Sequence, residues 1–203
     1  MGIVVQVVSN ATPVGTVTPW SSFYAYVQPE VPTLPLPVLD HVLRKAAIEF
    51  CEETAIHAID ATPITVVADT GTYALDSGDP ELDVSIVKFA WYDGKPLPFV
   101  SQEILNDQTG VYWPDQTSTA ATGFTQQDHG NLILYPIPTV GVTDGLKLKL
   151  VVRPSLTSTG VYDWIANRFI QEISFGALAM ATGMMPNSMP ESDATAVTAC
   201  KGP

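Results

Sequence analysis

The residues whose types and spacing could support catalysis lie in one short stretch, Val66 to Thr72. Asp69-Thr70-Gly71 follows three apolar residues, which is the pattern of an aspartic-protease motif. In that chemistry two carboxylates share a proton and activate water, so a chain with one motif would work as a dimer. Asp-x-Gly between two strands is also ordinary turn chemistry. We therefore interpret the stretch as a hairpin turn and keep a dimeric aspartic-type protease as an alternative.

Metal ligation is the second chemistry to consider. Four acids lie close together, but their spacing lacks the central glycine and closing glutamate of a calcium loop, and three scattered histidines form no zinc pair. The acids are Asp76, Asp79, Glu81 and Asp83, and the histidines are His41, His57 and His129. We expect no metal and no cofactor, and we interpret the acids as a solvated loop.

The net charge limits the possible partners. The chain has 9 Lys and Arg against 21 Asp and Glu, a formal charge of −12. This balance argues against neutralising phosphates, and so against sequence-specific nucleic-acid binding. Cys51 and Cys200 make no disulfide framework, which fits folding in a reducing cytoplasm. We expect neither a signal peptide nor a membrane span.

Two segments have the period of amphipathic helices, and we expect them to form the scaffold that positions the residues between them. In the range 37–60 the apolar residues recur at three- and four-residue steps, and 163–185 shows a similar but broader pattern. Between them the pattern alternates, as in strands, over 64–68, 72–75, 84–91, 96–100, 131–135 and 146–152. The predicted fold class is α+β, with two packed long helices (about 37–60 and 163–185) and an inserted antiparallel β lobe (about 63–153).

Three parts follow from this plan. Residues 1–36 form an N-terminal arm and a proline-rich lead-in, 37–62 and 160–203 form a helical part, and 63–159 form the β lobe. Within the lobe, Ser101 has the properties of a helix N-cap, and 106–127 is predicted to be a long polar loop. A receptor-binding β module that uses this loop is a further alternative function.

The order of the segments resembles a known family. FYAYVQPEVPTLP, VLDHVLRKAAIEFCEETAIHAID, VSIVKFAWYDGKPL, NLILYPIP, LKLKLVVRPS and FIQEISFGALAMATGMM occur in this order between Phe23 and Met185. The ordered set is similar to the head-to-tail adaptor proteins of short-tailed bacteriophages, although each motif alone is weak.

The resemblance implies a structural virion protein of the tail or neck that catalyses nothing and is assembled in the host cytoplasm. It implies a ring, dodecameric in that family, that docks on the portal protein, presents a platform to the tail nozzle protein and extends the DNA channel. Double-stranded DNA would pass through without sequence-specific binding, which fits the negative charge. The helical part would contact the portal and neighbouring subunits. The residues proposed for a subunit interface, a portal interface or the channel are Arg44, Lys45, Glu49, Glu52, Glu53, Arg168 and Glu172.

Overall fold

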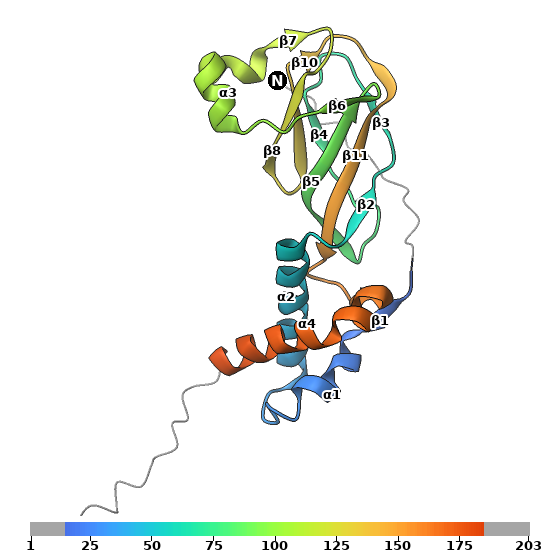
Figure 1. The fold of residues 1–203 in the computed structure, drawn as a ribbon, viewed down its shortest axis with the longest axis vertical. Coiled ribbons are helices and arrows are strands. Elements are labelled where there is room, and N and C mark those ends of the chain that lie inside the picture. Colours follow the sequence, from blue (N-terminus) through green and yellow to red (C-terminus); the bar gives the residue numbers. More distant parts are fainter. Residues whose placement is uncertain (1–14, 185–203) are drawn as a thin grey trace, which may run out of the picture.

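The computed structural model describes residues 15–184, so the ends of the predicted arm (1–36) and of the predicted helical part (160–203) lie outside the described residues. The molecule is elongated, with α1, α2 and α4 gathered at one end and most strands, together with α3, at the other (Figure 1). At the helical end, η1 (Trp20–Phe23) and α1 (Tyr24–Val27) precede the long helix α2 (Leu36–Thr54). Strands β1 (Val17–Pro19) and β12 (Gly160–Tyr162) pair there and lead into α4 (Asp163–Met184).

Helix α2 forms because its apolar residues repeat with the helical period and proline is favourable at its start. Pro37 lies in the first turn, where a missing N–H costs no hydrogen bond. The buried stripe consists of Leu39, Val42, Leu43, Ala46, Ala47 and Cys51. The expected end at residue 60 is wrong. Ala55 adopts a left-handed conformation (φ 47°) and stops the helix, and Ala58–Asp60 then form strand β2, paired with β11.

Small residues let α2 and α4 approach closely where they cross (Figure 1). A Cβ atom added to Gly176 of α4 would lie 3.5 Å from the Cβ of Ala46 on α2, which is ordinary van der Waals contact. Helix α4 is interrupted at Phe169, whose backbone is non-helical (φ −129°, ψ 22°). The Phe169 ring packs against Phe50 of α2, with ring centroids 5.1 Å apart. The kink therefore directs an aromatic side chain to the other helix.

The β end consists of two main sheets. In the five-stranded sheet, the central strand β11 (Val142–Pro154) pairs with β5 (Leu82–Tyr92), β2 and β3 (Ile64–Val66), and β6 (Lys95–Leu97) pairs with β5. The three-stranded sheet has β9 (Asn131–Tyr135) between β4 (Thr72–Ala74) and β8 (Gly123–Asp128). Alternate residues of β11, from Leu146 to Val152, are buried in one hydrophobic core with residues of the second sheet such as Leu132 and Leu134.

A helical segment projects from the β end where the sequence predicts a polar loop. Ser101 caps α3 (Gln102–Thr109) by accepting a hydrogen bond from the Ile104 N–H, so the predicted N-cap is confirmed. The loop predicted over 106–127 is wrong. This range contains the end of α3, η2 (Gly110–Asp115), β7 (Thr117–Ser118) and most of β8, and β7 pairs with β10 (Ile137–Pro138). The backbone groups bind within the protein, for example Ile137 N–H to Gln116 C=O at 2.8 Å.

The predicted fold class, two long packed helices with an inserted antiparallel β lobe, is wrong. The described residues form four α-helices, and helix and strand occupy comparable shares of the chain. The sheets also differ from a simple inserted lobe: β1 and β12 lie at the helical end, β7 and β10 are parallel, and α3 lies within the β part. Short elements such as these have too few residues to show a clear period, so the pattern finds only the long ones.

Candidate functional site

The solvent side of α2 carries a regular row of polar residues. Its members are spaced by four and exposed: His41, Lys45, Glu49 and Glu53. Glu49 and Glu53 lie one turn apart near the C-terminal end of the helix, where like charges repel and the helix dipole disfavours acids. Because this arrangement does not stabilise the helix, the two carboxylates are candidates for an external contact. We call these four residues the α2 stripe.

Arg44 and Glu52, which the sequence assigns to the same outer surface, bind instead within the chain. The Arg44 Nε donates to the Ser158 carbonyl at 3.2 Å. Glu52 forms an ion pair with Arg153 of β11, and both side chains are partly buried. These contacts tie α2 to β11 and to the β11–β12 connection. Among the α2 residues predicted to contact a partner, three therefore remain exposed and available for such a contact: Lys45, Glu49 and Glu53.

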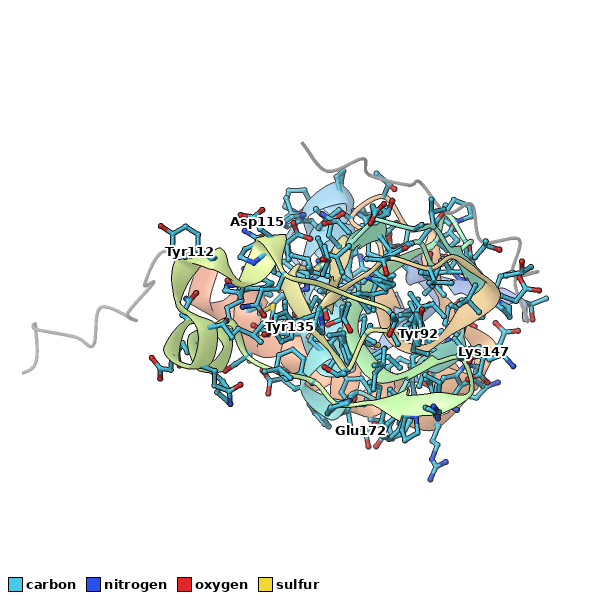
Figure 2. The ribbon with its side chains drawn as sticks, turned by 90° about the horizontal axis from the view of Figure 1, so that it is seen from above. Tyr92, Tyr112, Asp115, Tyr135, Lys147 and Glu172 are labelled. Carbon is cyan, nitrogen blue, oxygen red and sulfur yellow. The ribbon has the colours of Figure 1, made fainter. Side chains whose placement is uncertain are left out.

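Arg168 and Glu172 are both exposed on α4, and Figure 2 shows Glu172 at the margin of the molecule. Their four-residue spacing would suit a pair across one helical turn, but the ion pairs within residues 15–184 are Lys149–Asp60 and Glu52–Arg153. The non-helical Phe169 lies between them and changes the helical spacing. The Arg168 guanidinium carbon lies 5.5 Å from the centroid of the Phe169 ring, a cation–π contact.

Sequence reasoning missed a buried polar cluster where the helical and β ends meet. Tyr162 donates a hydrogen bond to Asp79, and its ring meets the His57 ring edge-on at 5.3 Å. Burial lowers the pKa of His57 to about 4, against the opposing effect of the Asp79 carboxylate. Burial and the bond to Asp79 raise the pKa of Tyr162. The neutral ring of His57 is thus part of the packing, and the cluster joins His57 and Tyr162 of the predicted helical part to Asp79 of the predicted β lobe.

The protease-like motif lies on a structural turn. Asp69 is exposed with a positive φ of 59°, and its N–H donates to the Pro138 carbonyl at 2.8 Å. The buried Tyr73 hydroxyl accepts from the Val67 N–H and donates to the Thr70 carbonyl, both at 3.1 Å. The expected hairpin is wrong, because β3 pairs with β11 and β4 pairs with β9 in another sheet. The turn connects two sheets, and its contacts explain the motif without catalysis.

The acids near residue 80 bind backbone and hydroxyl groups. Asp76 accepts from the Gly78 N–H at 2.9 Å, and Glu81 accepts from the Thr159 N–H at 2.6 Å. The expectation of a solvated loop therefore fits only in part, since Asp79 is buried. Within residues 15–184, no group of three or more acids, histidines or cysteines is placed to hold a metal ion.

Exposed aromatic residues on α4 are a further surface that the sequence pattern did not separate from the core. Phe175 is 68% exposed and Trp164 is 41% exposed, although both lie in the broadly apolar segment 163–185. In the part of the chain that the structure describes, no helix is both long and apolar enough to cross a lipid bilayer.

Comparison with known proteins identifies the family. No curated protein matches the chain. The family model described as SU10 adaptor protein matches residues 19–199, which is most of the chain and includes α2, α4 and the β end. This match confirms the resemblance to phage head-to-tail adaptor proteins. The chain therefore belongs to the SU10 adaptor protein family.

Proposed function

We propose that this phage adaptor protein forms a ring that connects the portal protein to the tail nozzle protein and extends the DNA channel. The single observation that carries the proposal is the family match over residues 19–199. The protein is a structural component of the virion neck, assembled in the host cytoplasm, with no catalytic role. We take a dodecamer as the ring size, following the family resemblance.

The charge of the chain supports a channel role. A formal charge of −12 opposes adsorption of DNA, so a duplex would slide through the ring without sticking. The exposed Glu49 and Glu53 of the α2 stripe are the residues that we assign to the lumen or to a neighbouring subunit. We exclude Glu52 from the residues assigned to the lumen or to a neighbouring subunit because it pairs with Arg153.

The elongated shape supports different binding partners for the two ends of the molecule (Figure 1). We propose that the helical part, residues 37–62 and 160–203, contacts the portal, and that the β part, residues 63–159, lies outside or toward the tail. Lys45 of α2 and the α4 residues Arg168 and Glu172 are our candidates for the portal contact. Each is exposed without an ion pair among the described residues.

The decisive experiment mixes the purified chain with the portal protein of its phage and examines the mixture by negative-stain electron microscopy. Rings that cap the portal are the expected result. Particles of portal alone beside monomeric chain would refute the proposal.

A second measurement addresses the α2 stripe. Glu49→Lys with Glu53→Lys should slow DNA ejection or impair ring formation, whereas Glu30→Lys, an exposed acid between α1 and α2, is the matched control with the same type of charge change. Normal packaging and ejection in the Glu49/Glu53 variant would remove the stripe from the proposed channel or interface.

A further inference from the structure

One face of the five-stranded sheet exposes aromatic and basic residues together. Strand register places Lys147 beside Trp91 and Lys149 beside Phe89, on the side of β11 and β5 opposite the buried Leu146 and Leu148. The Phe89 and Trp91 rings lie 6.0 Å apart, and Phe89 is 51% exposed. We call Phe89, Trp91, Lys147 and Lys149 the basic face.

The basic face is unusual for so acidic a chain. Five of the nine lysines and arginines lie on β5, β6 and β11, and two of these pair with acids, Lys149 with Asp60 and Arg153 with Glu52. The other three are Lys88, Lys95 and Lys147. A groove of about 570 Å³ runs beside Trp91 and Lys147, between Pro63 and Gly94. Asp60 also lines the groove and pairs with Lys149 at 3.5 Å, so Lys147 is the lysine of the basic face that has no ion pair within residues 15–184. An exposed Phe89 beside a half-buried Trp91 that lines a groove, with a lysine next to each ring, is typical of a protein-binding surface rather than of a solvated sheet.

The opposite side of the β end has the complementary composition. No lysine or arginine occurs from Pro96 to Leu146. Helices α3 and η2 in this range carry three exposed acids beside two exposed apolar side chains. These residues, which we call the acidic end, are Glu103, Ile104, Asp107, Tyr112 and Asp115. Tyr112 is 73% exposed, more than any other large apolar side chain whose exposure the structure describes.

The two surfaces lie on opposite sides of the molecule at the same end. Figure 2, a view along the long axis, shows Tyr112 and Asp115 on one side and Lys147 on the other. Both surfaces belong to the β end in Figure 1. The two complementary surfaces lie on opposite sides of the molecule, at the same level along its long axis. This arrangement allows head-to-tail contacts between copies, and such contacts close into a ring when the rotation from one copy to the next divides a full turn.

We propose that the acidic end of one copy docks on the basic face of the next, with Tyr112 entering the groove beside Trp91 and with Asp107 and Asp115 facing Lys147. The occupant of the basic face is thus a second copy of this chain. The inference rests on the proposed ring, and it assigns to the β end a subunit contact in addition to those of the helical part.

The experiment compares assembly of the wild type with that of two charge-reversal variants, with and without the portal, by mass photometry. Lys147→Glu and the double variant Asp107→Lys/Asp115→Lys should each raise the dissociation constant between copies about tenfold, because both replace attraction by repulsion. Lys147→Arg keeps the charge and should assemble as the wild type does. Glu30→Lys, at the other end of the molecule, controls for charge reversal of an exposed acid.

Mixing the two reversed variants tests the head-to-tail geometry. In an equimolar mixture the intact acidic end of Lys147→Glu meets the intact basic face of Asp107→Lys/Asp115→Lys, and the two reversed surfaces also carry opposite charges, so the mixture should recover the assembly that each variant alone has lost. Circular dichroism and thermal unfolding establish that the variants are folded.

The outcomes separate this inference from the proposed function. Rings of the wild type with assembly lost in the reversed variants support both. If folded Lys147→Glu assembles as well as the wild type, the inference is overturned and the ring proposal stands. If the wild type forms no ring even with the portal, both are refuted.

Discussion

Acidification should weaken the junction between the helical and β ends, and His57→Phe should remove most of this effect. The His57 ring is 8% exposed and lies edge-on to Tyr162 and Trp164, at 5.3 and 5.4 Å. Its Nδ1 is buried with no hydrogen-bond partner among the described residues. A phenylalanine can keep the ring packing and removes an unpaired polar atom, so its stability at pH 7 should lie within about 1 kcal/mol of the wild type.

The size of the effect follows from the pKa of His57, which falls from 6.5 to about 4 on folding. Because the folded value is the lower one, the unfolded chain binds more protons between about pH 6.5 and pH 4. The stabilisation is complete above pH 6.5 and is lost as the pH falls toward 4. Each pKa unit corresponds to about 1.4 kcal/mol, so the wild type should lose about 3 kcal/mol across this range.

Urea unfolding followed by circular dichroism at several pH values between 4 and 8 measures this loss. The difference in unfolding free energy between wild type and His57→Phe should grow by about 3 kcal/mol in favour of the variant as the pH drops. His41→Phe, an exposed position on α2, controls for the general effect of losing a histidine. Parallel pH dependences of the wild type and His57→Phe would refute the assignment of a buried, neutral histidine to the junction.

Two further predictions concern the contacts that stabilise the helical end of the molecule. Gly176→Ala should be neutral or stabilise by up to about 1 kcal/mol in thermal unfolding, because the added Cβ meets Ala46 at an ordinary 3.5 Å and alanine favours a helix. Gly160→Ala should destabilise strongly, since its Cβ would clash with the Thr18 carbonyl in the β1–β12 pair; equal melting temperatures for the two variants would contradict this contrast. Glu52→Ala should cost about 1–3 kcal/mol, because the Nε of Arg153 is already buried without a partner. A double-mutant cycle with Arg153→Ala should give a coupling of about 1 kcal/mol, and additive losses would argue against the ion pair as a link between α2 and β11.

Long periodic segments were predictable from local pattern. In α2 the buried residues are those with three- and four-residue spacing, because one face of a helix must leave water. Asp-Gly is a common two-residue hairpin sequence, and Asp93-Gly94 joins β5 and β6 as an antiparallel hairpin with both residues at positive φ. These features depend on neighbours in sequence.

The fold class was mispredicted because it depends on distant partners. Residues 58–60 continue a helical pattern, yet they pair with Lys149–Val151 of β11. The Asp69 turn has hairpin chemistry, but its two strands enter different sheets. A strand's pattern shows which face is buried and does not reveal which strand it pairs with.

The candidate surfaces show the same difference between features set by local sequence and features set by distant contacts. Residue types alone indicate that Arg44 and Glu52 are polar, but only the packing of α2 on β11 and the 155–159 connection shows that they bind internally. The lysines of β11 alternate visibly in the sequence, whereas their position beside Phe89 and Trp91 depends on the register with β5.

The sequence by itself determined the negative charge, the amphipathic character of α2 and the ordered motifs that carry the family resemblance, since these are properties of composition and local spacing. The tertiary structure alone decided which carboxylates stay free, how His57, Tyr162 and Asp79 come together, and that an acidic end and a basic face lie on opposite sides of the β end. The physical reason is that these features arise from contacts between residues far apart in the chain, which local periodicity does not encode.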